Sequence, residues 1–440
     1  MLSEEELGSW RRTHLSSQIK PELNGSEVLV MGWVSSIRDH GNIVFVMLTD
    51  KDEEMQVTAK LDECGKELFE KIRALKEHSS IGVKGKVRSI DNAPNGAEVV
   101  PNDMRIFSLA KKVPPFPTYS RSVANVDTRL DLRAIDLRRG VLQAVFKIRR
   151  GVLNAIREFL NKEGFIEVNT PKMIATATEG GAALFPIFYY DREAFLAQSP
   201  QLYKEQLTMA FERVFEVGPI FRAEPSRTMK HLSEAISIDV EQAFANYDDV
   251  TNLLEKIIAY VIESVSKNNV AEFEILQTKV DKPSLPFARH KYSDLVELLR
   301  KEGEKIEWGD DFSTENLKKL GSIMNKFYFI TDWPSASKPF YAKPKTDDEN
   351  LCESFDLMFG DLEIASGSSR INRKDQLVER MKKQGLNPEA FDYHLRVFDY
   401  GVPPHAGFGV GLERFMMTLT GVENIRDVTL YPRDIDRLAP

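Results

Sequence analysis

Residues 354–371, SFDLMFGDLEIASGSSRI, place opposite charges close together in the chain. A Phe-Gly-Asp sequence typical of a tight turn separates Asp356 from Glu363, so a hairpin could bring both carboxylates to one side. With Ser366 they offer the hard oxygen ligands that suit Mg²⁺ bound to phosphates. Arg370 follows a run of small residues and offers a planar fork for a carboxylate or phosphate. A solvated hairpin with a surface ion pair explains these residues equally well.

A second candidate cluster is QSPQLYK, residues 198–204. A helix that begins at the Ser-Pro pair would place Gln201 and Lys204 on adjacent turns of one face. A buried lysine there could meet a ligand carboxylate, although a lysine at a helix start is more often solvated.

A third cluster spans residues 221–241, FRAEPSRTMKHLSEAISIDVE. A strand is expected to end in Arg222-Ala223-Glu224, with Arg222 and Glu224 on one face. A basic loop and a second strand follow, with charged residues at Arg227, Lys230, His231, Asp239 and Glu241. An arginine at an α-phosphate, beneath a flexible basic loop, suits electrostatic catalysis of nucleotidyl transfer. A surface hairpin with a charged tip is the alternative.

Two glycine-rich segments complete the candidates. In GFGVGLERF, residues 407–415, alternate glycines let a strand approach a flat ligand or another backbone, and Arg414 begins the next helix. The glycine spacing does not match the dinucleotide fingerprint. TATEGGA, residues 176–182, predicts a flexible loop with one acid, Glu179, which would serve as a lid or only as a linker.

The pattern of apolar runs predicts two domains of mixed α+β class. Five strand-like runs between residues 20 and 110, with a helix-like stretch at 62–77 after the third, have the order of an OB-fold barrel, a common binder of single-stranded nucleic acid. We therefore expect an OB-fold over 1–110, a Pro-rich linker or hinge over 111–135 and a catalytic domain over 136–440. Residues 281–345, rich in proline and charge, look like an insertion or peripheral lobe.

The bulk composition is that of an ordinary globular protein. The chain has 440 residues, 42% of them hydrophobic, and a net charge of -8, which argues against wholesale coating of nucleic acid. Cys64 and Cys352 form no disulfide framework and no metal spacing, so a reducing cytoplasm fits best. The start, MLSEEELGSWRR, does not resemble a signal peptide, and no apolar run approaches the ~18 residues of a membrane span.

Taken in order, these segments resemble the three signature motifs of class II aminoacyl-tRNA synthetases. FIEVNTP, which ends in Pro171, resembles motif 1; FRAE…HLSEAISIDVE resembles motif 2; GFGVGLERF resembles motif 3. An OB-fold ahead of the catalytic domain is typical of the subgroup that handles aspartate, asparagine and lysine. The resemblance implies an antiparallel catalytic sheet flanked by helices, and a homodimer with Pro171 at its interface.

Within the subgroup the sequence resembles aspartate-specific members of the archaeal and eukaryotic form. The resemblance places Gln201 near the substrate's α-amino group, and Lys204 and Arg370 at its β-carboxylate, with Asp239 holding the lysine. An asparagine amide could not satisfy both cations and would leave buried charge unpaired. The aspartate-binding residues implied by the family are Glu179, Ser199, Gln201, Lys204, Asp239, Ser366 and Arg370.

The reaction implied by the family has no general base. The aspartate α-carboxylate attacks the α-phosphorus of ATP in line, Arg222 and Mg²⁺ stabilise the developing charge, and Arg414 holds the γ-phosphate of a bent ATP. The tRNA then accepts the aspartyl group. The implied catalytic residues are Arg222 and Arg414, the metal ligands are Asp356, Glu363 and Ser366, and the ATP-binding residues are Arg222, Glu224, Arg227, His231, Leu232, Glu363, Gly411 and Arg414.

The OB-fold carries positions that match anticodon contacts of the family. Arg38, Phe45 and Gln56 would stack on or bond the bases, although Phe45 sits in an apolar run and could be core. Pro94 matches relatives that charge both tRNA-Asp and tRNA-Asn, whereas Ser35 matches neither pattern, so dual tRNA specificity stays open. Ala235 departs from the family at a position where an aromatic residue often stacks on adenine.

Three alternatives compete with the aspartate-specific interpretation. Lys204 and Asp239 count against an asparaginyl-tRNA synthetase. The OB-fold counts against a tRNA-independent amide synthetase. A non-catalytic relative would usually have lost the motif arginines or the metal acids, which this chain retains as Arg222, Arg414, Asp356 and Glu363.

Overall fold

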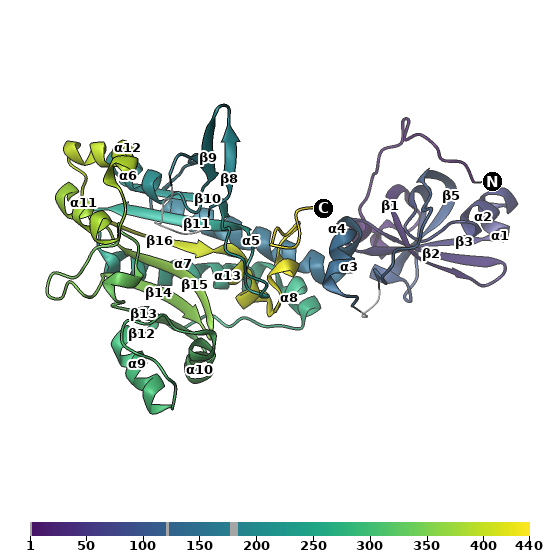
Figure 1. Ribbon diagram of the computed structural model, residues 1–440. Coiled ribbons are helices and arrows are strands. Elements are labelled where there is room, and N and C mark those ends of the chain that lie inside the picture. Colours follow the sequence, from purple (N-terminus) through teal and green to yellow (C-terminus); the bar gives the residue numbers. More distant parts are fainter. Residues whose placement is uncertain (1, 120–122, 177–183) are drawn as a thin grey trace. The chain divides into compact units, whose positions relative to one another are not determined.

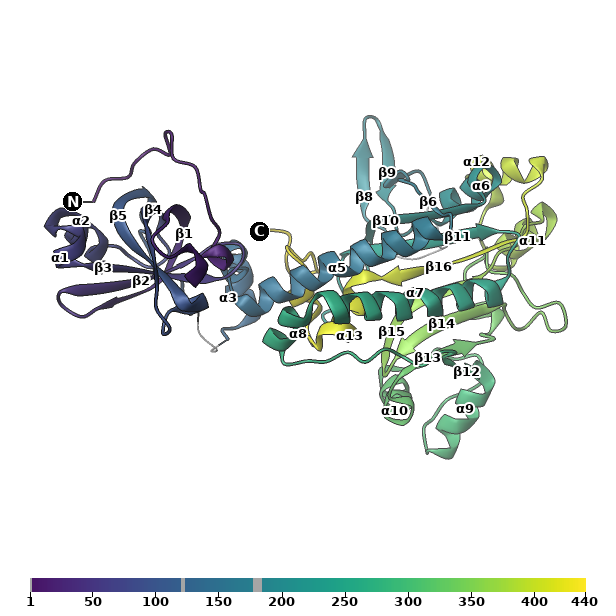
Figure 2. The same ribbon diagram turned by 180° about the vertical axis from the view of Figure 1, so that it is seen from behind.

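The computed structural model describes residues 2–119, 123–176 and 184–440. The chain divides into two compact units, residues 1–132 and 133–440, which we describe separately (Figures 1 and 2).

The first unit is a closed five-stranded barrel, as an OB-fold requires. The strands follow the order β1-β2-β3-β5-β4, and alternate residues of each strand fill the barrel core. The predicted helix after the third strand is present but broken in two at Gly65, whose φ of 79° is easily reached only by glycine. The elements are β1 (Glu27–Asp39), β2 (Ile43–Thr49), β3 (Glu54–Lys60), α1 (Leu61–Cys64), α2 (Lys66–Arg73), β4 (Ser80–Ser89), β5 (Ala97–Ser108) and α3 (Val126–Asp131).

The second unit is built on an eight-stranded sheet in the order β12-β13-β14-β15-β16-β11-β10-β6. The strands from β13 to β10 run antiparallel, and β12 and β6 add parallel pairs at the two edges. The strands are β6 (Ile166–Glu167), β10 (Arg213–Phe221), β11 (Glu234–Ala243), β12 (Ala288–Lys291), β13 (Phe327–Thr331), β14 (Ser354–Phe359), β15 (Leu362–Ser369) and β16 (His405–Gly411).

Two long helices, α5 (Gly140–Lys162) and α7 (Tyr247–Asn268), lie side by side over one face of this sheet (Figure 2). Apolar residues at helical spacing turn one stripe of α5 into the main core. The Asn246 side chain caps α7 by accepting hydrogen bonds from the backbone N–H groups of Asp248 and Asp249. The other helices are α4 (Arg133–Asp136), α6 (Gln201–Phe211), α8 (Val270–Leu276), α9 (Tyr292–Lys301), α10 (Thr314–Met324), α11 (Lys374–Lys383), α12 (Asp392–Leu395) and α13 (Leu412–Thr420).

The segment FIEVNTPKMI does not form the single strand that its sequence predicts. It splits into β6, at the edge of the large sheet, and β7 (Met173–Ile174), which joins β9 (Arg192–Leu196) and β8 (Pro186–Tyr189) in a separate small sheet. Pro171 lies between β6 and β7, where its missing N–H costs no ladder bond.

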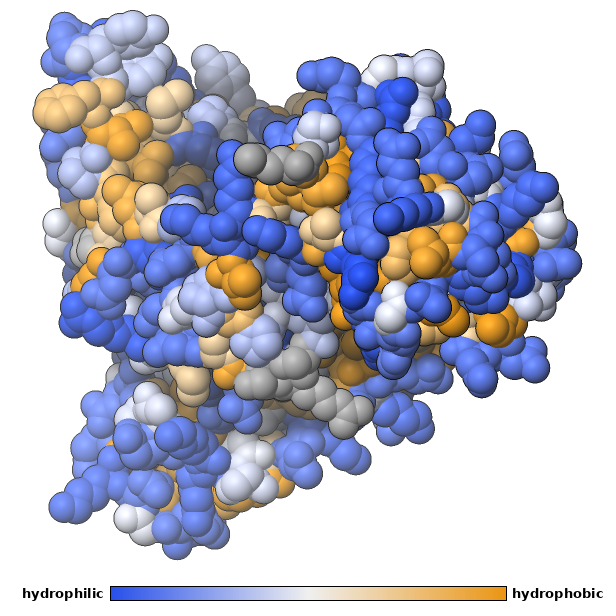
Figure 3. Space-filling view, turned by 90° about the vertical axis from the view of Figure 1, so that its right-hand side faces the viewer, coloured by the Kyte–Doolittle hydropathy of each residue, from blue (hydrophilic) through white to orange (hydrophobic). Residues whose placement is uncertain are grey.

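Residues 281–345 are joined to the main sheet rather than forming a lobe outside it. They supply β12 and β13, and α9 and α10 pack on a small core of their own beside those strands. Among the described residues no helix is long and apolar enough to cross a membrane. On the face shown in Figure 3, hydrophilic residues predominate and hydrophobic ones form scattered patches.

Candidate active site

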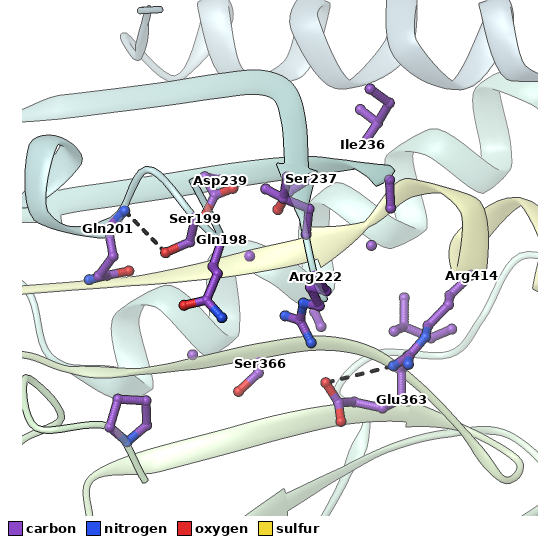
Figure 4. Close-up of a pocket in the computed structure, with 18 of the residues that line it drawn as sticks. Gln198, Ser199, Gln201, Arg222, Ile236, Ser237, Asp239, Glu363, Ser366 and Arg414 are labelled. Atoms are coloured by element: carbon purple, nitrogen blue, oxygen red, sulfur yellow. Dashed lines mark hydrogen bonds and ion pairs between the residues drawn. The ribbon is translucent and has the colours of Figure 1, made fainter. Parts of the chain in front are cut away.

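A cavity of about 270 Å³ lies in the second unit, where β11, β15 and β16 meet the first turns of α6 and α13. Figure 4 shows its labelled side chains converging from these elements, with Arg222 between Gln198 and Glu363. The cavity joins three clusters that are far apart in the sequence. Its lining includes the predicted residues Ser199, Gln201, Lys204, Arg222, His231, Leu232, Asp239, Glu363, Ser366, Arg370, Gly411 and Arg414.

The predicted hairpin is present as β14 and β15. Asp356 pairs with Ser366, but the register then shifts so that Met358 pairs with Glu363. Because side chains alternate along a strand, this bulge lets Glu363 and Ser366 line the same cavity although they are three residues apart. Gly360, with a φ of 56°, makes the turn.

Asp356 is buried and already has a cationic partner. The ammonium of Lys338 lies 3.0 and 2.8 Å from its two carboxylate oxygens and also over the ring of Trp333. Burial raises the pKa of Asp356, the Lys338 ammonium counteracts it, and the charge of Glu363 raises it further. The charges of Asp356 and Glu363 therefore act on each other, although only Glu363 lines the cavity and Asp356 is buried behind the lining.

The donors here fit a divalent ion that also binds phosphate. Among the described residues no group of three or more His, Cys, Asp or Glu side chains could hold a metal. Asp356, Glu363 and the Ser366 hydroxyl supply hard oxygen ligands only, and leave further positions for oxygens of a nucleotide or water. An ion held by these side chains would need oxygens of the nucleotide or of water to complete its coordination shell.

At another part of the cavity, two buried cations face two buried carboxylates. The Lys204 ammonium lies 3.0 Å from Asp239 and 3.3 Å from Glu241. Arg370 bonds Glu241 through Nε at 2.9 Å and through a terminal nitrogen at 3.2 Å, and its other terminal nitrogen donates to Ser368 at 2.7 Å.

Burial alone would lower the pKa of Arg370, but Glu241 outweighs it and the pKa is raised. The Arg370 guanidinium therefore stays charged, and its bonds to Glu241 and Ser368 fix its position. The sequence predicted that Asp239 holds Lys204; it did not predict that Glu241 holds Arg370.

The alternate glycines of β16 make room for these carboxylates. A Cβ at Gly407 would lie 2.1 Å from a Glu241 oxygen, and one at Gly409 would lie 3.2 Å from Asp239. The glycines therefore serve the ion-pair network, besides any role toward a flat ligand.

A third part of the cavity is rich in arginine. Arg414, at the start of α13, donates to the backbone carbonyl of Glu363 at 3.2 Å and lies 3.4 Å from Nε2 of His231. It also forms an ion pair of 4.0 Å with the Glu363 carboxylate (Figure 4). Burial and the neighbouring Arg414 lower the pKa of His231, so its imidazole is neutral at pH 7. Arg222 follows the last residue of β10 and reaches the cavity from the opposite side.

Some predicted residues lie elsewhere. Because β10 ends at Phe221, Arg222 and Glu224 are not the same-face strand pair that alternation predicted. Glu224 and Arg227 are exposed and outside the cavity lining, and Arg227 bonds Asp436 of the C-terminal segment at 3.0 Å. Glu179 lies outside the described residues.

Among the cavity-lining residues that sequence reasoning missed are Lys338, Tyr341 and Glu413. Glu413 accepts from Arg149 at 2.9 Å and from the backbone N–H of Ile236 at 3.0 Å, which ties α13 to α5 and β11. Glu413 could have been predicted as a site residue, because it directly precedes Arg414 in the sequence. Lys338 and Tyr341 carried none, because their segment was assigned to a peripheral lobe.

In the first unit, the predicted anticodon positions lie on neighbouring strands. Arg38 pairs with Phe45, and Met47 pairs with Gln56. Phe45 is half-buried on the outer side of β2, whereas its neighbours fill the barrel core, so the alternative that Phe45 is core is wrong. The Gln56 amide nitrogen donates to the buried carboxylate of Glu98 at 2.8 Å. Pro94 lies in the partly exposed turn between β4 and β5.

An OB-fold barrel joined to an antiparallel sheet with motif 1, 2 and 3 segments defines a class II aminoacyl-tRNA synthetase. Family comparison agrees. Residues 125–435 match the family of tRNA synthetases class II (D, K and N), and residues 28–107 match the OB-fold nucleic acid binding domain. The chain belongs to this class II synthetase family.

Relatives of similar length are found in archaea. A protein of Methanocaldococcus jannaschii named aspartate--tRNA(Asp/Asn) ligase is 49% identical, over 98% of this chain and 99% of that protein. One of the same name from Methanothermobacter thermautotrophicus is 47% identical, over 99% and 100%.

Solved structures with the same fold include synthetases named for asparagine and synthetases named for aspartate. Asparaginyl-tRNA synthetase from Pyrococcus horikoshii, complexed with asparaginyl-adenylate, superposes with a TM-score of 0.93 at 31% identity, covering 98% of this chain and 100% of that one. Aspartyl tRNA synthetase from Entamoeba histolytica superposes with a TM-score of 0.85 at 31% identity, covering 98% and 93%. The fold and the identity to these two structures therefore do not decide between aspartate and asparagine, and the side chains of the site must be compared.

Proposed function

We propose that this enzyme ligates L-aspartate to tRNA-Asp in an ATP-dependent reaction, through an aspartyl-adenylate. The observation that carries the proposal is the buried Lys204, held by Asp239 beside Arg370 in the cavity. Two fixed donor groups, the Lys204 ammonium and the Arg370 guanidinium, match the two acceptor oxygens of a carboxylate side chain, whereas the NH₂ group of an amide would place a donor against a donor. The names of the archaeal relatives support the same substrate.

In this proposal the chain's residues bind and orient, and no side chain acts as a general base. Gln201 and Ser199 face the amino acid, Arg222 contacts the α-phosphate, and Arg414 with the neutral His231 holds the γ-phosphate. Mg²⁺ bound by Asp356, Glu363 and Ser366 would supply additional positive charge at the phosphates. Glu224, Arg227, Leu232 and Gly411 remain proposed contacts of the nucleotide, and Glu179 of the substrate.

We further propose that tRNA-Asn is a second acceptor. The relatives' names include both tRNAs, and Pro94 occupies a turn in contact with β3, the strand that carries Gln56. An enzyme of this kind would form Asp-tRNA-Asn, which a separate amidating reaction would have to convert.

Aminoacylation tests both proposals. Labelled aspartate is offered with purified tRNA-Asp and tRNA-Asn transcripts, and labelled asparagine is run in parallel. We expect aspartate on both tRNAs and no charging with asparagine. Aspartate on tRNA-Asp alone would reject the second acceptor, and charging with asparagine, or none at all, would reject the proposed function.

The OB-fold of residues 1–110 is proposed to bind the anticodon. Replacing Arg38 by alanine should raise the KM for tRNA about tenfold, since a lost charge-assisted contact costs about 1.5–3 kcal/mol, and leave pyrophosphate exchange unchanged. Steady-state charging and exchange assays measure the two effects. Lys84→Ala, which removes an exposed cation from β4, is the matched control. Equal effects of the two variants would show non-specific attraction instead.

The adenine end of the cavity lacks an aromatic side chain at Ala235, which pairs with Ile220 across the β10–β11 hairpin and lines the cavity. We expect Ala235→Phe to lower the KM for ATP at least about fivefold, because base stacking on a ring contributes about 1–3 kcal/mol. ATP titration of pyrophosphate exchange measures it, with Ala235→Leu as the apolar control. Equal gains in both variants would indicate apolar contact without stacking.

We also propose a cytoplasmic homodimer with Pro171 at the interface. The supporting observation is that apolar side chains on either side of Pro171 are exposed, Ile166 by 46% and Met173 by 56%. Sedimentation of the wild type and Ile166→Glu tests the dimer. A monomeric wild type would reject it.

A further inference from the structure

A buried carboxylate lies between two imidazoles one helical turn after Gln201. Glu205 of α6 is 1% exposed, and its Oε2 lies 3.5 Å from Nε2 of His394 and 3.6 Å from Nε2 of His405. The two histidines come from α12 and the start of β16, so three distant segments meet at this carboxylate. None of the three side chains lines the cavity, and the proposed mechanism uses none of them.

The hydrogen-bond partners define the proton on His394. The amide nitrogen of Gln206 donates to the carbonyl of Leu202 at 3.0 Å, which identifies it as the NH₂ group, and it lies 3.1 Å from Nδ1 of His394. Nδ1 of His394 is therefore the acceptor, and its proton is on Nε2, facing Glu205.

His405 has a different partner. Its Nδ1 lies 2.8 Å from the carbonyl oxygen of Pro403, which can only accept, so Nδ1 carries a proton. A second proton on Nε2, facing the Glu205 carboxylate, makes His405 an imidazolium. The directions of the pKa shifts agree: burial opposes charge on both groups, but contacts with His394 and His405 lower the pKa of Glu205, and contact with Glu205 raises that of His405.

An ionised Glu205 determines how the Gln201 amide is oriented. The carboxylate accepts hydrogen bonds but cannot donate, and the Gln201 side-chain nitrogen donates to its Oε1 at 2.6 Å. The opposite amide orientation would set two oxygens against each other. Figure 4 shows the amide oxygen of Gln201 on the side of the other labelled cavity residues and its nitrogen turned away.

We propose that Glu205, held between His394 and His405, is a positioning residue that turns the carbonyl oxygen of Gln201 into the cavity, where it accepts a hydrogen bond from the substrate's α-ammonium. This rests on the proposed function and adds a residue that selects α-amino acids. Glu205 does not touch the substrate; its effect on the α-ammonium is exerted through Gln201.

A double-mutant cycle tests the pathway from Glu205 to Gln201. Equilibrium binding of L-aspartate and of succinate, which lacks the α-ammonium, is measured by titration calorimetry for the wild type, Glu205→Gln, Gln201→Met and the double variant. Glu205→Gln should weaken L-aspartate binding about tenfold, as expected when a hydrogen bond to a charged group is lost, and change succinate binding less than about twofold. In the Gln201→Met background the same change should have almost no effect.

Two controls keep the test decisive. Thr208→Val alters a buried polar residue of the same helix, whose hydroxyl bonds only the Glu205 backbone carbonyl, and should bind L-aspartate like the wild type. Glu205→Asp, which keeps the charge but withdraws it from Gln201, serves if Glu205→Gln does not fold.

Additive losses in the cycle, or equal weakening of aspartate and succinate binding, would overturn the inference. A wild type that binds no aspartate and performs no aspartate-dependent pyrophosphate exchange would instead reject the proposed function.

Discussion

Replacing Arg370 by leucine is expected to lower aspartate activation by at least about a thousandfold while ATP binding remains measurable. The change removes the proposed clamp on the β-carboxylate, and it also leaves Glu241 buried with only Lys204 to neutralise it. Breaking one partner of a buried ion pair costs about 3–5 kcal/mol, so we also expect a lower melting temperature. Pyrophosphate exchange, ATP titration and thermal unfolding measure the three quantities.

Arg370→Lys separates the two effects. It keeps the positive charge for Glu241 but loses the planar fork that bonds both Glu241 oxygens. We expect most of the stability to return and only a small part of the aspartate activation. Normal activation in either variant would remove Arg370 from the substrate site.

Replacing Asp356 by asparagine is expected to abolish most Mg²⁺-dependent pyrophosphate exchange, with a loss of about 10³-fold. An amide is a weaker ligand for a hard cation than a carboxylate, and it no longer neutralises the ammonium of Lys338. Exchange is measured over a range of Mg²⁺ concentrations, where a metal role predicts a right-shifted dependence.

The turn of the same hairpin offers a matched control. Asp361→Asn alters an acid that is not one of the proposed metal ligands and whose ion pair with Lys230 is partly exposed, so it should keep exchange near the wild-type level. Normal exchange in Asp356→Asn would assign the hairpin carboxylates a structural role only.

The elements that depend on neighbouring residues were predicted correctly from the sequence. The barrel strands follow from alternation, and the β14–β15 hairpin from its turn residues. The break in the helix at Gly65 was not predicted, because helical spacing continues across it and only the backbone conformation shows the interruption. The prediction of a single strand around Pro171 was wrong because the two halves of this segment pair with strands from different parts of the chain, which no local pattern encodes.

The candidate site shows the same division. Motif residues such as Arg222 and Arg414 could be found because their type and spacing are characteristic. The ion pairs within the site could not be predicted, since the bonds from Lys338 to Asp356 and from Arg370 to Glu241 join residues 18 and 129 positions apart in the chain. Glu205 has no recognisable signal in the sequence, because the two histidines that surround it come from distant segments of the chain.

The bond between Lys338 and Asp356 makes metal binding an exchange of cations rather than the filling of an empty site. A divalent ion arriving alone must compete with an ammonium that already neutralises the carboxylate, so we expect it to bind weakly. A nucleotide brings negative oxygens to which that ammonium can turn. The carbonyl of Lys338 accepts from Gln384 of the segment after α11 at 2.9 Å, so the backbone of this lysine stays anchored while its side chain changes partner. Ion and nucleotide should therefore bind cooperatively, each raising the affinity for the other.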